Sequence, residues 1–390
     1  MMSYKWPLMT NIITWKDKWE LIKFIATSDR FTNGQRVRKF ETEWNSWLGS
    51  QHSLFVANGS CANLLLMSAM REKFGLRRGA KVIVPACTWV TNISPVIQCG
   101  LRPIFCDVNL ENYSFDLEHL KLIASKHHDI KAVFFTHLLG YSADVEAVRE
   151  ILPNAIFLED VCESHGCLAP DGKRRGHNAL GATFSFYFGH HMTTVEGGMV
   201  STHDEELYSI MRAKRSHGLA RELPASKFEQ AKEENPSIDP NFLFITEGYN
   251  FRNTEIAAVL GSSQLTKLDD TIKKRNENLG MFMAVLEEHQ DSFYLPSKAS
   301  TTSSYAFPLI LRDGSKIGEL KSALTASGIE YRPIVGGNLL LQPFLSRYKI
   351  EAGSDMNVQI LNDNGLYLGN NQHVGENEMA LLSEVLNKIS

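Results

Sequence analysis

Residues 52–75 read HSLFVANGSCANLLLMSAMREKFG and set the pattern for most of the chain. An apolar strand signal runs to Asn58-Gly59, and apolar residues at helical spacing follow at once. A strand that leads directly into a helix is typical of a βαβ unit in a parallel sheet. The free N–H groups at the helix start favour a phosphate, with Gly59 allowing close approach and Ser60 adding a hydroxyl. Serine is equally an ordinary N-cap, so this stretch alone leaves both interpretations open.

Further apolar runs alternate with helical patterns up to about residue 265. Most are continuous in Val, Ile and Phe, which suits a mostly parallel sheet covered on both faces: AKVIVPACTWV (80–90), RPIFCDV (102–108), IKAVFFTHLLG (130–140), NAIFLEDV (154–161), ATFSFYF (182–188) and GMVSTHD (198–204). A long helical stretch and a β-α-β pattern come after them. We therefore predict an α/β protein with a large domain over 1–265 and a small C-terminal α+β domain over 266–390.

The composition excludes several classes of partner. The 390 residues carry a formal net charge of −4 with the two signs interspersed, which argues against nucleic acid and against a membrane surface. Neither a secretory leader nor an apolar run of roughly 18 residues is evident, so we expect a cytoplasmic protein. The six cysteines all lie in the first half, mostly in strand-like segments, as is typical of free thiols, and we predict that none of them binds a metal.

Two strand ends carry side chains that could take part in ligand binding or catalysis. Trp89 follows a strand that ends at Pro85, where it would either stack on a planar ring or fill the core. Asp160 ends the apolar strand AIFLED, and a buried carboxylate there needs a partner such as a protonated ring nitrogen. The alternative is a metal site made of Asp160, Cys162, His165 and Cys167, but these residues lack a recognised ligand spacing.

A third strand end reads FSFYFGHHMTTVEGGMVST, residues 184–202. With the motifs above, it makes the chain resemble the sugar aminotransferases of the DegT/DnrJ/EryC1/StrS family. These enzymes bind pyridoxal phosphate on the aspartate aminotransferase-like (type I) fold. The resemblance begins at SDRFTNGQRVRKFETEW and continues through EDVCESHG and GYNFRNTEIAAVLGSSQL to YRPIV. It therefore spans nearly the whole chain, with many motifs in the same order.

The resemblance implies a set of cofactor contacts. Gly59, Ser60 and Ser185 would hold the phosphate, and Trp89 would stack on the pyridine ring. Asp160 would keep the pyridine nitrogen protonated, which strengthens the ring as an electron sink.

Two more contacts come from the same resemblance. Glu163 stands where the family has a Gln or Glu near the ring. Asn250 matches a residue that reaches the phosphate of the neighbouring subunit. The resemblance thus implies a homodimer with shared active sites.

One position departs from the family pattern. The Schiff-base lysine of the family lies five residues after the serine of the Ser-Phe strand, and His190 occupies that place here. An imidazole cannot form the imine, but it can remove and return protons near neutral pH. We therefore expect a cofactor that is held noncovalently, most usefully as pyridoxamine phosphate.

The same substitution, with two histidines before Glu-Gly-Gly, occurs in the sugar 3-dehydratase branch of the family. This branch implies removal of the C3 hydroxyl from a nucleotide-linked 4-keto-6-deoxy sugar, with His190 as the base. It also implies glutamate as the amino donor and a place in deoxysugar biosynthesis for lipopolysaccharide O-antigen. The branch that carries an iron–sulfur cluster is excluded, because no cysteine follows Cys167.

Some roles stay open at this point. The resemblance places His217 close to the cofactor or amino donor, and Arg221 and Arg332 would pair with a donor carboxylate or a sugar-nucleotide phosphate. Ordinary surface roles are the alternative for all three. An aminotransferase that still delivers nitrogen to a sugar is one alternative function. A non-catalytic scaffold is another, although cofactor-compatible residues at Asp160 and Ser185 argue against it.

Overall fold

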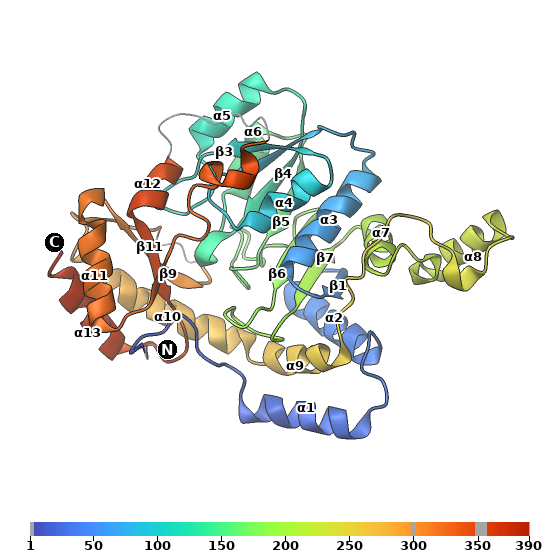
Figure 1. Ribbon diagram of the computed structural model, residues 1–390, viewed down its shortest axis with the longest axis horizontal. Coiled ribbons are helices and arrows are strands. Elements are labelled where there is room, and N and C mark those ends of the chain that lie inside the picture. Colours follow the sequence, from blue (N-terminus) through green and yellow to red (C-terminus); the bar gives the residue numbers. More distant parts are fainter. Residues whose placement is uncertain (1–3, 298–300, 348–356, 390) are drawn as a thin grey trace.

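The structure, a computed structural model, describes residues 4–297, 301–347 and 357–389. At its centre is a seven-stranded sheet (Figure 1), in the spatial order β1 (His52–Val56), β7 (Gly198–Thr202), β6 (Gly181–Ser185), β5 (Ile156–Asp160), β4 (Ile130–Thr136), β2 (Lys81–Pro85) and β3 (Arg102–Cys106). β7 runs antiparallel to both of its neighbours, and the other paired strands are parallel. The predicted α/β class with a mostly parallel sheet is confirmed.

Helices cover both faces of this sheet, which explains why its strands are apolar at successive positions. Leu54 and Val84 pack against one set of helices, namely α3 (Gly59–Lys73), α4 (Ser94–Gln98) and α7 (Glu205–Arg215). Phe55 and Ile83 face the opposite set: α2 (Gln35–Leu48), α5 (Leu117–Lys126), α6 (Val145–Ile151) and α9 (Glu255–Leu265).

A second, antiparallel sheet lies beside the first. Its order is β10 (Tyr331–Pro333), β11 (Gly365–Gly369), β9 (Ala306–Leu311) and β8 (Phe293–Tyr294). The helices around it are α10 (Leu268–Glu287), α11 (Ile317–Ser327), α12 (Asn357–Asn364) and α13 (Glu376–Leu386). Trp6 is buried in the same cluster and donates its indole N–H to the Gly369 carbonyl at 2.8 Å. The division at residues 265/266 stays a prediction.

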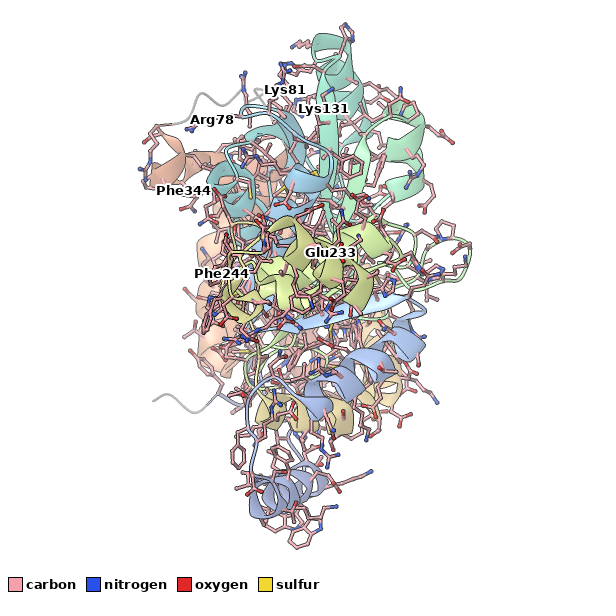
Figure 2. The ribbon with its side chains drawn as sticks, turned by 90° about the vertical axis from the view of Figure 1, so that its right-hand side faces the viewer. Arg78, Lys81, Lys131, Glu233, Phe244 and Phe344 are labelled. Atoms are coloured by element: carbon pink, nitrogen blue, oxygen red, sulfur yellow. The ribbon has the colours of Figure 1, made fainter. Side chains whose placement is uncertain are left out.

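Two elements extend from the body. α1 (Trp15–Thr27) packs along α9, and α8 (Ala225–Glu234) stands on an arm far from both sheets (Figure 1). Figure 2 looks at this arm end-on, with Phe244 and Glu233 labelled on it. The remaining helical segments are single 3₁₀ turns, at Val90–Asn92, Leu138–Gly140, Ala220–Glu222, Pro240–Phe242, Gly314–Lys316, Leu339–Leu341 and Pro343–Leu345. No helix in the described ranges has the length and apolarity needed to cross a membrane.

Candidate active site

The carboxyl edge of the main sheet brings the predicted residues together. β5 ends at Asp160, β6 ends at Ser185, and β1 leads through Asn58 into α3. β1 and β6 each pair antiparallel with β7 and therefore point the same way. In an open α/β sheet this edge is where ligands bind.

The loop from β1 to α3 forms a cradle for an anion. Asn58 caps the helix by accepting the Cys61 N–H at 2.8 Å, which leaves the earlier N–H groups of the first turn for a ligand. A Cβ on Gly59 would lie 2.7 Å from the Ser185 Cβ, so only glycine lets the loop approach that strand end. Ser60 is exposed at the same helix end. The two hydroxyls and the helix N-terminus suit a phosphate.

Asp160 is buried beside this cradle. One of its carboxylate oxygens accepts the Asn63 side-chain N–H at 2.7 Å, and the other accepts the Cys162 backbone N–H at 2.9 Å. Burial raises the pKa of Asp160 above its ordinary value. Within the described ranges no ion pair joins Asp160 to a cation. A protonated ring nitrogen would therefore be stabilised here, because it would supply the missing positive charge.

The neighbouring carboxylate has a different environment. Glu159 accepts a hydrogen bond from His137 at 3.2 Å and another from the Gly176 N–H at 2.7 Å. Burial opposes ionisation, but these bonds and the charge of Arg175 keep the pKa of Glu159 below its ordinary value. Glu159 is thus internally satisfied, and Asp160 is the member of the pair that is left for a ligand.

Sequence reasoning missed Asn63, which orients Asp160. Its amide nitrogen also donates to the Thr91 carbonyl at 3.1 Å, and its oxygen accepts the Thr183 hydroxyl at 2.5 Å. A polar residue on a helix face that is otherwise fully apolar was the available signal. Trp89 lies two residues before Thr91 and is 55% exposed, so it does not fill the core.

Glu163 follows β5 and contacts the turn after β4. It accepts the backbone N–H of Leu139 at 3.0 Å, and Leu139 has an unusual φ of 53°. Burial, reinforced by the charge of Asp160, raises the pKa of Glu163 to about 7. Burial raises the pKa of Tyr305, which lies just before β9, and of Tyr367 in β11, and the charge of nearby Glu163 raises both further.

His190 follows β6 and is only 8% exposed. Its ring lies against Tyr187 and Tyr305, with ring centroids 6.1 and 5.4 Å away. Burial, with a smaller effect from the Arg275 guanidinium, lowers the pKa of His190 to about 3. The imidazole is therefore neutral at physiological pH, which is the form that accepts a proton.

The remaining predicted residues lie at the rim. Asn250 is exposed and bonded to Arg252, which also contacts His217 at 3.2 Å. The same segment lies beside the cradle strand, since Phe251 accepts the Ala57 N–H at 2.9 Å.

The two arginines are more distant. Arg221 donates to the Asn241 carbonyl on the arm at 3.2 Å. Arg332 pairs with Glu330 at 3.1 Å and lies opposite Tyr367 in the β10–β11 register. Across the described residues, no hydrogen bond or ion pair joins either arginine to the cradle. In the same ranges, no group of three or more His, Cys, Asp or Glu side chains is placed to hold a metal ion.

Comparison with known proteins gives consistent matches. A sequence profile of the DegT/DnrJ/EryC1/StrS aminotransferase family matches residues 14–382. GDP-4-keto-6-deoxy-D-mannose 3-dehydratase of Yersinia pseudotuberculosis is 35% identical over 395 residues, 98% of each chain. A crystal structure of such a dehydratase, in a histidine-to-asparagine variant with bound GDP-perosamine, superposes with a TM-score of 0.91 at 32% identity, covering 98% of this chain and 100% of that one. Another, with a trapped PLP-glutamate geminal diamine, gives 0.89 at 31% identity and the same coverage.

Proposed function

The chain belongs to the DegT/DnrJ/EryC1/StrS aminotransferase family of pyridoxal-phosphate-dependent nucleotide-sugar enzymes, and we propose that it removes the C3 hydroxyl of a nucleotide-linked 4-keto-6-deoxy sugar. The observation that carries the proposal is His190, a buried neutral imidazole at the position of the family lysine. GDP-4-keto-6-deoxy-D-mannose is the substrate to test first, since it is the one that the similar dehydratases are named for.

The residues of the cradle fit pyridoxamine phosphate. Gly59, Ser60 and Ser185 would hold its phosphate at the start of α3, and Asp160 would pair with its protonated ring nitrogen. Glu163 would face the ring edge, and Trp89 would cover the ring. When bound, this cofactor supplies an amine for the C4 ketone and a ring that accepts an electron pair.

His190 would move the proton. Its imidazole would take a proton from the cofactor's methylene carbon and then, as the imidazolium, protonate the C3 hydroxyl as it leaves. Because burial disfavours the imidazolium, the proton is returned readily. Glutamate would reload the cofactor with nitrogen between turnovers.

The test is a product assay. The protein is incubated with the GDP-linked 4-keto-6-deoxy sugar, pyridoxal phosphate and glutamate, and the products are analysed by mass spectrometry. We expect a 3-deoxy-4-keto sugar nucleotide and ammonia. An amino sugar would indicate the alternative aminotransferase, and no turnover on any 4-keto-6-deoxy nucleotide sugar would indicate a scaffold.

The mode of cofactor attachment gives an independent check. Borohydride reduction of the loaded protein should leave no pyridoxyl group on any lysine, because no lysine stands at position 190. A pyridoxyl-lysine peptide would contradict the proposal.

We also propose that the protein works as a homodimer. Asn250 is exposed beside its own cradle strand, and the arm that follows His217 ends in exposed aromatic side chains. Both features suit a second copy of the chain that completes the site.

A further inference from the structure

Three imidazoles lie together in the interior, and one of them is that of His190, the proposed base. His165 comes from the loop after β5, and His190 and His191 come from the turn after β6. The ring centroid of His165 is 6.0 Å from that of His190 and 5.5 Å from that of His191. Trp44, Phe184 and Phe186 surround the His165 ring on its other sides.

His165 is fully buried, and its hydrogen bonding is incomplete. Within residues 4–297, 301–347 and 357–389, neither of its ring nitrogens has a hydrogen-bond partner. The backbone of Ser185 is close enough to the ring to raise the pKa of His165 in opposition to burial, but it does not meet the geometry of a formed hydrogen bond. A buried polar side chain with no partner is rare in a folded protein and calls for a functional explanation.

His190 presents its two nitrogens differently. Nδ1 is buried and has no partner, whereas Nε2 is not among the buried atoms that lack a partner. Nε2 is therefore the nitrogen that can reach a substrate. For Nε2 to act as the base it must carry the lone pair, so the neutral ring must hold its proton on Nδ1. That buried N–H needs an acceptor.

Ser303, next to His191, fixes the direction in which the hydrogen bonds of the cluster run. The Ser303 hydroxyl donates to the His165 carbonyl at 2.6 Å, so its proton is already used. The Ser303 carbonyl and hydroxyl oxygens both lie 3.2 Å from His191 Nε2, and both can only accept there. His191 must therefore carry its proton on Nε2 and a lone pair on Nδ1, which is buried and has no partner.

We infer that His165 is a positioning residue that holds His190 in the tautomer with a free Nε2 lone pair. His165 accepts the Nδ1–H of His190 on one nitrogen and donates from the other to Nδ1 of His191. His191 then donates to Ser303, so His165 and His191 each donate once and accept once, and His190 only donates. This inference rests on the proposed role of His190 as the base.

The spacing fits such a chain. Two imidazoles joined by one N–H···N bond have centroids about 5.2 Å apart, because the N···N distance is about 3 Å and each nitrogen lies roughly 1.1 Å from its centroid. The observed centroid distances, 6.0 and 5.5 Å, are slightly longer than this. Small side-chain rotations would bring each pair of nitrogens to hydrogen-bonding distance. The Arg275 guanidinium and burial both lower the pKa of all three imidazoles, which keeps them neutral as the chain requires.

Nitrogen NMR of the resting protein tests the inference without turnover. The protein is labelled with ¹⁵N-histidine, loaded with pyridoxamine phosphate, and examined by long-range ¹H–¹⁵N correlation; His190 is assigned by its loss in His190→Asn. We expect a protonated Nδ1 and an unprotonated Nε2. His165→Leu should shift His190 toward the opposite tautomer, and His165→Gln, whose amide both accepts and donates, should restore it. Phe184→Leu, which changes the packing against His165 and Trp44 but removes no hydrogen-bonding group, should leave the tautomer unchanged.

Kinetics give the second readout. Holding a catalytic histidine in the wrong tautomer costs up to about 10⁴-fold in kcat in a serine protease triad. We expect His165→Leu to lower kcat by about 10- to 100-fold with little change in KM, and His165→Gln to recover most of it. An unchanged His190 tautomer in His165→Leu would overturn the inference, and so would an unchanged kcat. If His190→Asn keeps full turnover, the proposed base is wrong, and the tautomer measured in the resting protein still decides the role of His165.

Discussion

His190 cannot form the imine that a lysine would form, and its burial keeps the imidazole neutral. His190→Asn keeps the size and polarity of the side chain but has no basic nitrogen. We expect it to lower dehydration by at least 10²–10⁴-fold, the usual range for a lost general base, and more because the same group also acts as the acid. Cofactor binding, measured by absorbance titration, should persist through Ser185 and Asp160, whose contacts do not involve the imidazole. Undiminished turnover would contradict the assignment of the base.

The ionisation of Glu163 should make the stability of the folded protein depend on pH near neutrality. Its pKa is raised from the ordinary 4.5 to about 7, so the folded protein keeps a proton that the unfolded chain has released between these values. Stability should therefore fall as pH rises through this window. Glu163→Gln removes the titration. Urea denaturation from pH 5 to 8 gives the unfolding free energy of both proteins. The value for the wild type should decrease relative to that for Glu163→Gln as pH rises. A constant difference would contradict the raised pKa.

The residues that could be predicted from the sequence are those that end parallel strands. Asp160 and Ser185 close apolar runs, and parallel strands bring their ends to one edge of the sheet. Asn63, His165 and Arg275 could not be found in this way. Their partners are distant in the chain. Asn63 left one signal, a polar residue on an apolar helix face, whereas His165 and Arg275 become informative only through burial against another element.

At the scale of elements, the N-terminus of α2 depends on a residue of α9. Glu255 is buried and accepts the backbone N–H groups of Gly34, Arg36 and Val37 at 2.8–2.9 Å. A carboxylate at this end of a helix satisfies donors that would otherwise have no partner and complements the helix dipole. These three hydrogen bonds connect the start of α2 to the start of α9.

Glu255→Ala should therefore destabilise the protein by about 2–4 kcal/mol, because it leaves three backbone donors, two of them buried, without their acceptor. The measurement is the midpoint of urea unfolding at constant m-value. Glu118→Ala is the matched control: this glutamate is also in the first turn of a helix, α5, but its side chain is 82% exposed. The control should change stability by less than about 0.5 kcal/mol. Equal effects of the two variants would contradict the capping role.

The elements themselves were largely predictable, since the seven central strands coincide with the apolar runs of the sequence. The antiparallel direction of β7 was not predictable, because a buried strand is equally apolar in either direction. The packing of Trp6 in the second cluster also left no local signal, since it depends on a contact with Gly369 near the other end of the chain.

At the scale of the whole molecule, the arm around α8 has only a small hydrophobic core of its own. Its small cluster contains Ala220, Ala231 and Leu243. Phe242 and Phe244 are 65% and 58% exposed beside it. Aromatic side chains displayed together on a projecting element are typical of a protein interface. A second copy of the chain is the occupant that the proposed shared site requires.

Phe244→Asp should therefore shift the protein from dimer to monomer in sedimentation velocity, since a charge in an apolar interface is strongly unfavourable. Leu122→Asp is the matched control, because Leu122 is also 58% exposed but lies on α5, away from the arm (Figure 1). The control should sediment as the wild type. An unchanged dimer in Phe244→Asp would exclude Phe244 from the interface.

We expect His190→Asn and Asn250→Ala each to be inactive as homodimers, because each removes a proposed residue of the site, and mixing the two tests whether the sites are shared. If Asn250 acts on the neighbouring subunit's cofactor, a heterodimer of His190→Asn and Asn250→Ala contains one site with both changes and one site with neither. Equal mixing and subunit exchange should then restore about a quarter of the wild-type activity, because half of the dimers are mixed and half of their sites are intact. If Asn250 acts within its own chain, every site carries one change and no activity returns. Recovery should fail when the Asn250→Ala chain also carries Phe244→Asp, since that chain no longer pairs.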